Sequence, residues 1–198
     1  LVAVCEYVFR QRTAGFLDKV FSNRSRSVIH NSTSDDLGAR CRRIKEPVEI
    51  LAVIPVTRRK GIFDLIALSM KLSELAPSLR FRIHVVGQQR DKKAVEEVRL
   101  SLRKHRLEDV LVLHGEQDRD CLTQYYAQAD VLVHPSHSEA FPRAVIEAFG
   151  FSLPCVATNV GGTGEAVVEG YNGYLVPVGR PEMMAGRVVD VVSNADVY

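Results

Sequence analysis

The segment Ile50-Leu51-Ala52-Val53-Ile54 is a run of five apolar residues, and it sets the pattern for the rest of the chain. A short apolar run without polar alternation is typical of a strand that is buried on both faces, as strands of parallel sheets are. The residues from Gly61 to about Leu75 then alternate with helical spacing between an apolar face and a charged face. This strand-and-helix pair is the unit from which we predict the fold.

The same alternation continues to the C-terminal end of the sequence. Further strands are expected at 81–86, 110–113, 130–134, 155–158 and 174–176, and further helices at 92–105, 120–128, 142–149, 165–168 and 181–192. Strands that alternate with helices predict an α/β fold, here a Rossmann-like, doubly wound parallel sheet of about six strands with helices on both faces. Residues 1–47 do not show this alternation of strands and helices, and we interpret them as a linker with one helix from about Thr13 to Phe21. Residues 48–198 are the predicted domain.

Composition excludes several classes of protein. The 198 residues are 46% hydrophobic and 25% charged with a net charge of +2, which argues against a disordered chain and against a strong nucleic-acid binder. No apolar run approaches the ~20 residues of a transmembrane helix, and the start at Leu1 has no basic leader, so we expect a cytoplasmic protein. The absence of an initiator Met suggests a fragment of a longer chain. The four cysteines are widely spaced, which favours reduced thiols over a disulfide framework or a zinc site.

Candidate ligand-binding residues follow the predicted strands, because parallel sheets bind ligands beyond the carboxyl ends of their strands. Glycines there allow a ligand to approach the backbone, although loops of this kind are often rich in glycine whatever their function. Taken together they favour a nucleotide-like ligand only mildly. The residues at these exits are Arg59-Lys60-Gly61, Gly87-Gln88, His114-Gly115, Ser138-Glu139 and Gly161-Gly162-Thr163.

Two glutamates flank the start of the helix expected from Pro142. Glu139 precedes the helix and Glu147 lies inside it, with seven residues between them. Each also has a structural interpretation: Glu139 as an anion near a helix N-terminus, and Glu147 as an ion-pair partner of Arg143. His134 and His137 with Glu139 are too loosely spaced for a zinc site, so no metal is expected.

The two glutamates belong to a longer series of motifs that resembles a known family. The series continues with Ala148-Phe149-Gly150, Leu153-Pro154-Cys155-Val156-Ala157-Thr158, Val160-Gly161-Gly162-Thr163-Gly164-Glu165 and Asn172-Gly173-Tyr174-Leu175-Val176-Pro177. It is similar to the retaining glycosyltransferases of the GT-B fold, the group 1 or family 4-like enzymes. The resemblance runs from about Val48 to Val192 and covers the C-terminal, donor-binding half of those enzymes.

The resemblance implies an activity and its participants. The activity would be metal-independent transfer of a hexose, with retention, from a UDP- or GDP-type nucleotide-sugar to a glycan or lipid-linked acceptor. The nucleotide-sugar is a substrate, and no cofactor is implied. The acceptor would bind to an N-terminal domain missing from this sequence, which could also give peripheral membrane association, and the fragment alone would be inactive.

The resemblance also assigns roles to individual residues. Glu139 would bind hydroxyls of the donor sugar and Lys60 would contact the diphosphate, so these two are the predicted catalytic residues. Glu147 would bind the ribose. The remaining predicted donor-binding residues are Arg59, Gly87, Gln88, His114, Gly115, Phe141, Gly161, Gly162 and Thr163, the last three through backbone amides at a helix start.

Departures from the family pattern support an alternative function. Ile54-Pro55 stands where the family usually has Gly-Arg, whose arginine shares the diphosphate with the lysine, and Arg143 replaces a common asparagine. The alternative is therefore a degenerate, non-catalytic nucleotide-sugar-binding or structural module of the same fold. An unrelated doubly wound regulator would instead have acidic residues after the first strand, where this sequence is basic.

Overall fold

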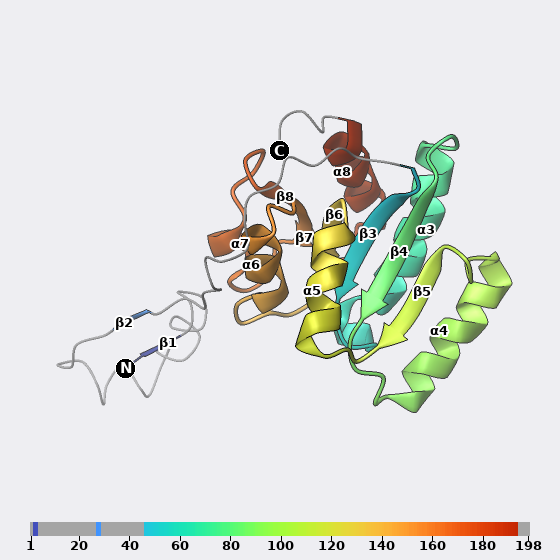
Figure 1. Ribbon diagram of the computed structural model, residues 1–198, viewed down its shortest axis with the longest axis horizontal. Helices are drawn as coiled ribbons and strands as arrows, with labels where there is room; N and C mark the ends of the chain where they lie inside the picture. The colour runs from blue at the N-terminus through green and yellow to red at the C-terminus, as the bar shows by residue number, and fades with distance from the viewer. Residues whose placement is uncertain (1, 4–26, 29–45, 194–198) are drawn as a thin grey trace.

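The computed structural model describes residues 2–3, 27–28 and 46–193 (Figure 1). Two short parallel strands, β1 (Val2–Ala3) and β2 (Ser27–Val28), pair with each other. The helix expected from about Thr13 to Phe21 and most of the predicted linker lie outside the described residues. The rest of the fold is built from residues 46–193.

Six strands form one parallel sheet, as the apolar pattern predicts. Its order is β5-β4-β3-β6-β7-β8, and every neighbouring pair is parallel. The strands are β3 (Val48–Val53), β4 (Phe81–Val86), β5 (Leu111–Gly115), β6 (Val131–His134), β7 (Cys155–Thr158) and β8 (Gly173–Val176).

Helices connect the strands close to the predicted positions. Asp91 and Asp118 cap α4 and α5 by accepting from the backbone N–H groups of Ala94 (3.0 Å) and Cys121 (2.8 Å). The helix expected from Glu165 instead begins two residues earlier, at Thr163. The elements are the short 3₁₀ helix η1 (Arg58–Lys60), α3 (Ile62–Leu75), α4 (Lys92–His105), α5 (Arg119–Gln128), α6 (Arg143–Gly150), α7 (Thr163–Ala166) and α8 (Pro181–Ser193).

The sheet separates two hydrophobic cores, because successive side chains of a strand point to opposite faces. Ile50 and Ala52 of β3 pack in the larger core with α3, α4 and α8. Leu51, between them in the sequence, packs in the second core with α5, α6 and α7. Both faces of the central strand are therefore buried, which is why its sequence is continuously apolar.

The chain reverses its winding direction between β3 and β6. From β3 it adds β4 and β5 on one side, then crosses back to add β6, β7 and β8 on the other. Such a reversal opens a crevice at the carboxyl ends of the two central strands, where open α/β sheets bind ligands. We call this edge of the sheet the rim. Strands β3 and β6 both end there, and the segments that follow them begin there.

Candidate functional site

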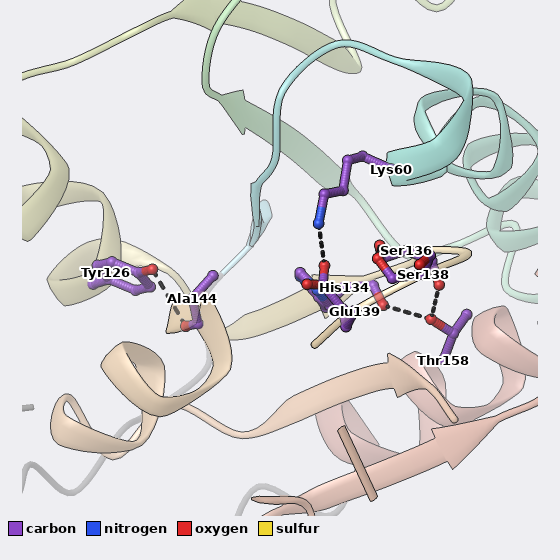
Figure 2. A network of polar contacts seen from close by, with 8 residues as sticks. All are labelled: Lys60, Tyr126, His134, Ser136, Ser138, Glu139, Ala144 and Thr158. Carbon is purple, nitrogen blue, oxygen red and sulfur yellow. Dashed lines mark hydrogen bonds and ion pairs between the residues drawn. The ribbon is translucent and has the colours of Figure 1, made fainter. Parts of the chain in front are cut away.

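Lys60 and Glu139 meet at the rim (Figure 2). Lys60 ends η1 after β3, and Glu139 lies in the loop between β6 and α6. The Lys60 Nζ and Glu139 Oε1 atoms are 2.5 Å apart, although the residues are 79 positions apart in the sequence. Their side chains are only 19% and 10% exposed. The structure thus brings together the two predicted catalytic residues in a largely enclosed ion pair.

Close backbone packing fixes the loops that carry this pair. Gly61 and Gly161 both have positive φ, and a Cβ on either would lie 2.1 Å from the carbonyl oxygen of Pro135 or 1.7 Å from that of Glu139. The His137 N–H also donates to the carbonyl oxygen of Arg59 (2.9 Å). The exits of β3, β6 and β7 therefore form one interlocked unit, and no side chain larger than hydrogen fits at either glycine.

His134 is a further member of the site, and residue spacing alone does not reveal it. Its Nε2 lies 2.9 Å from Glu139 Oε1, and an ionised carboxylate can only accept, so His134 donates. The His134 side chain is 4% exposed, and its Nδ1 is buried without a partner among the described residues. The Thr158 hydroxyl donates to the carbonyl oxygens of Ser136 and His134 (Figure 2). Glu139 is thus held from two sides, by a lysine and by a histidine.

The surroundings of Glu139 keep it ionised. Burial by itself would raise the pKa of the Glu139 carboxyl, but hydrogen bonds from His134 and Lys60, together with their charges, lower the pKa to about 2. Glu139 is therefore an acceptor for hydroxyl groups at any physiological pH.

The low pKa of Glu139 predicts a difference in acid stability between wild type and Glu139→Gln. A carboxyl whose pKa falls on folding stabilises the fold above its unfolded value of 4.5, and this contribution is lost as the pH falls towards 2. Between pH 7 and pH 3, we expect wild type to lose about 2 kcal/mol more free energy of unfolding than Glu139→Gln. Urea titrations at each pH measure this difference. Glu74→Gln, which alters an exposed ion pair with Lys71, should follow the wild-type curve. Parallel curves for wild type and Glu139→Gln would contradict the assignment.

Glu147 lies in a separate polar group on α6. Its Oε2 accepts from the hydroxyl of the buried Tyr126 at 2.9 Å, and its Oε1 lies 3.5 Å from Arg143 Nη2. The Arg143 pair of the structural interpretation is therefore present, but Arg143 is 77% exposed. Burial and the neighbouring Glu147 raise the pKa of Tyr126. Tyr126 thus stays a donor that fixes one oxygen of Glu147, a role that residue spacing does not reveal.

The predicted ribose and base residues meet where β4 and β5 end. The Gly87 N–H donates to the carbonyl oxygen of Gly115 at 2.8 Å. The Gln88 carbonyl oxygen accepts from the Val56 N–H at 2.9 Å, and its side-chain amide donates to Glu116. These segments therefore extend the rim away from Lys60, towards His114.

Two of the three amides predicted to face phosphate have other partners. The Gly162 N–H donates to the carbonyl oxygen of Ala140 and the Thr163 N–H to that of Val160, each at 3.0 Å. These bonds hold the loop after β7 against the loop of Glu139. Phosphate binding by the three amides stays a prediction.

Of the remaining predicted donor-binding residues, one is exposed to solvent and one is buried in the interior. Arg59 is exposed, while the neighbouring Arg58 pairs with Glu97 of α4 and lies over the Phe63 ring, 4.3 Å from its centroid. Phe141 is 7% exposed, so its ring belongs to the interior. In residues 46–193 no group of His, Cys, Asp and Glu is arranged to hold a metal ion. None of the described helices combines the length and the apolar character that crossing a bilayer requires.

Two relatives have sequences similar to most of the chain. An uncharacterised glycosyltransferase of Methanocaldococcus jannaschii is 25% identical over 197 residues, covering 100% of this chain and 50% of the relative. The glycogen synthase of Mycobacterium tuberculosis is 34% identical over 150 residues, covering 76% of this chain and 34% of that enzyme. The chain thus spans half or less of the length of these relatives.

Solved structures of glycosyltransferases share the fold. The Anabaena protein HepE in complex with UDP-glucose superimposes with a TM-score of 0.81 at 20% identity, over 98% of this chain and 54% of HepE. The C-terminal domain of a group 1 family glycosyl transferase from Francisella tularensis gives a TM-score of 0.66 at 23% identity, over 78% of this chain and 80% of that domain. The fold is that of one half of a GT-B enzyme. The family model of the group 1 glycosyl transferases matches residues 39–197, and the chain therefore belongs to this family.

Proposed function

We propose that this chain is the donor-binding half of a glycosyltransferase. The whole enzyme transfers a hexose, with retention and without a metal ion, from a UDP- or GDP-type nucleotide-sugar to a glycan or lipid-linked acceptor. The observation that carries the proposal is the enclosed Lys60–Glu139 pair at the point where the sheet reverses. In this proposal the acceptor binds to an N-terminal domain, without which the fragment is inactive. Cytoplasmic location, with peripheral membrane contact through that domain, is part of the same proposal.

Lys60 supplies the charge that such a reaction needs. When the bond between the sugar and the diphosphate breaks, negative charge develops on the departing diphosphate. A preorganised ammonium group in a largely enclosed site stabilises that charge without having to reorganise. Because Lys60 pairs with Glu139 before the donor arrives, part of its attraction is transferred to the diphosphate on binding.

The two glutamates then bind the two ends of the donor. Glu139 is ionised, so it accepts hydrogen bonds from sugar hydroxyls, and His134 keeps its carboxylate oriented. Glu147 has one oxygen held by Tyr126 and accepts from the ribose hydroxyls. In this scheme neither glutamate is a covalent nucleophile. Retention follows if the acceptor attacks from the face that the diphosphate leaves.

Binding of nucleotides tests this function directly. We expect UDP or GDP to raise the melting temperature of the chain at millimolar concentration, because a ligand that binds only the folded state stabilises it. Glu147→Ala should weaken the affinity for that nucleotide about tenfold or more, as loss of a hydrogen-bonding charge does. A thermal melt measures the first effect, and isothermal titration calorimetry measures the second. Glu182→Ala, which changes an exposed carboxylate on α8, is the control and should bind as wild type does. Absence of any UDP or GDP effect on wild type would refute the proposed function.

One observation favours the alternative of a degenerate binding module. Ile54 is 1% exposed and its N–H donates to the carbonyl oxygen of Val86, so the position where the family has glycine is filled by a packed side chain. Arg58, a possible substitute for the missing arginine, pairs with Glu97. Turnover by the intact wild-type protein would end this alternative. Nucleotide binding without turnover of any donor would support it.

A further inference from the structure

Three polar side chains form a hydrogen-bonded row across neighbouring strands of the sheet. They are Glu49 of β3, His84 of β4 and His114 of β5. Glu49 Oε2 lies 2.7 Å from His84 Nε2, and His84 Nδ1 lies 2.8 Å from His114 Nε2. The row leads from the start of β3 to the end of β5, and Figure 1 shows these strands beside α5. We call these three residues the relay.

Neighbouring groups hold the relay in place. The Glu49 backbone N–H donates to Asp130 Oδ2 at 2.8 Å, and its Oε1 lies 3.8 Å from Arg82. Tyr125 of α5 packs against both histidine rings, with its ring centroid 4.8 Å from that of His114 and 5.8 Å from that of His84. The side chains of His84 and Glu49 are only 19% and 26% exposed. The row is therefore a packed part of the sheet rather than a set of free surface groups.

The chemistry of the three groups gives the row a direction. An ionised carboxylate only accepts, so His84 Nε2 must carry a hydrogen. A neutral His84 then has a lone pair on Nδ1, which accepts from a hydrogen on His114 Nε2. A neutral His114 with its hydrogen on Nε2 is left with a lone pair on Nδ1. The carboxylate of Glu49 thus determines, through His84, which nitrogen of His114 accepts.

His114 carries this lone pair one residue before the end of β5. Gly115, the next residue, closes β5 and accepts from Gly87. Within residues 46–193, His114 Nδ1 has no hydrogen-bond partner and is not buried. Burial and the adjacent His84 lower the pKa of His114, which keeps its ring neutral. His114 therefore carries an acceptor next to the strand exit that holds the predicted ribose and base residues.

Building on the proposed function, we propose that Glu49 and His84 are positioning residues for His114. They hold His114 in the tautomer whose Nδ1 accepts a hydrogen bond from an N–H or O–H group of the donor's nucleoside. Neither Glu49 nor His84 has to touch the donor for this role. The relay would thereby set part of the affinity for the nucleoside, separately from the Lys60–Glu139 pair.

Nitrogen-15 NMR of the histidine rings tests the relay itself. In the full chain at pH 8, we expect His114 to carry its hydrogen on Nε2, with Nδ1 unprotonated. In Glu49→Gln the amide can donate as well as accept, so both tautomers of His114 should appear. His84→Phe keeps a ring beside Tyr125 and removes both nitrogens, and it should have the same effect. Glu46→Gln, in an exposed pair with Arg80, is the matched control and should leave His114 unchanged.

Titration with UDP tests the role of the relay in binding. Glu49→Gln and His84→Phe should each weaken UDP binding, about twofold where the two His114 tautomers are equally populated and up to about tenfold where the accepting tautomer is lost, and Glu46→Gln should not. Equal UDP affinity in wild type and both relay variants would overturn this inference and leave the proposed function standing. Two equally populated tautomers of His114 in wild type would also overturn it. If UDP and GDP bind to none of these proteins, the proposed function fails, and the role of the relay fails with it.

Discussion

Replacing Lys60 by alanine should lower the turnover of the proposed intact enzyme by about a hundredfold or more. Removal of one group that stabilises developing charge in a water-poor site has an effect of this size. Lys60 is such a group, since its side chain is 19% exposed and its ammonium lies against Glu139, where three strand exits meet. Glu139→Gln keeps the shape of the side chain but not its charge, and it should lower turnover to a similar extent. The rate of release of the nucleoside diphosphate from a donor that wild type uses measures both effects.

A matched lysine separates loss of catalysis from loss of a salt bridge. Lys71 pairs with Glu74 at 2.6 Å, but both side chains are exposed on α3. Lys71→Ala should therefore leave turnover at the wild-type rate. Near-normal rates for Lys60→Ala would remove the central argument of the proposed function. Equal losses for Lys60→Ala and Lys71→Ala would show instead that the rate reports general stability.

Replacing Gly161 by alanine should lower the free energy of unfolding by about 3 to 5 kcal/mol. The φ angle of Gly161 is +56°, a conformation that costs other residues about 1–2 kcal/mol. The added Cβ would also lie 1.7 Å from the carbonyl oxygen of Glu139, which forces the two loops apart. Urea denaturation measures the loss. Because the displaced loop carries Glu139, nucleotide-sugar binding should weaken in the same variant.

Gly179 provides the control for this substitution. Its φ angle is +68°, also left-handed, but nothing lies within 4 Å of the Cβ that alanine would add. Gly179→Ala should therefore cost only the conformational part, about 1–2 kcal/mol, with no change in binding. Comparing the stability losses of the two variants separates the cost of the contact between the loops from the cost of the left-handed backbone angle. Similar losses in the two variants would refute the close packing of Gly161 against Glu139.

The sheet could be predicted from the sequence because its signals are local. The apolar run from Ile50 to Ile54 requires burial on both faces, and the structure places Leu51 and Ile50 in opposite cores. Strand and helix positions then follow from periodicity within each segment. The short helix α7 begins two residues before its predicted start, because the turn at Gly161 and Gly162 determines where it begins. The family resemblance and the rule that strand exits share one edge predict that Lys60 and Glu139 lie at the same rim, but they do not predict the direct ion pair.

The partners of the site residues could not be predicted, because they depend on register and on tertiary packing. Tyr126 reaches Glu147 from another helix, 21 positions away. His84 and His114 face each other only in the observed pairing of β4 with β5, which shifts register between Val85 and Val86. Alternation within one strand specifies a face but not the neighbour across it. A histidine in an otherwise apolar strand is the only signal that the sequence offers for such a partner.

The order of the strands also has a consequence for how the protein is made. β3 leaves the ribosome well before its neighbour β6, which is encoded some eighty codons later, after two complete strand-and-helix units. Until then the newly synthesised chain can assemble only β3, β4 and β5, and Lys60 has no counter-ion. Contacts between such distant segments form late, since closing a long loop costs entropy before the contact repays it. The proposed ability to hold an activated sugar would therefore arise in a single late step of biosynthesis, when the second half of the sheet docks.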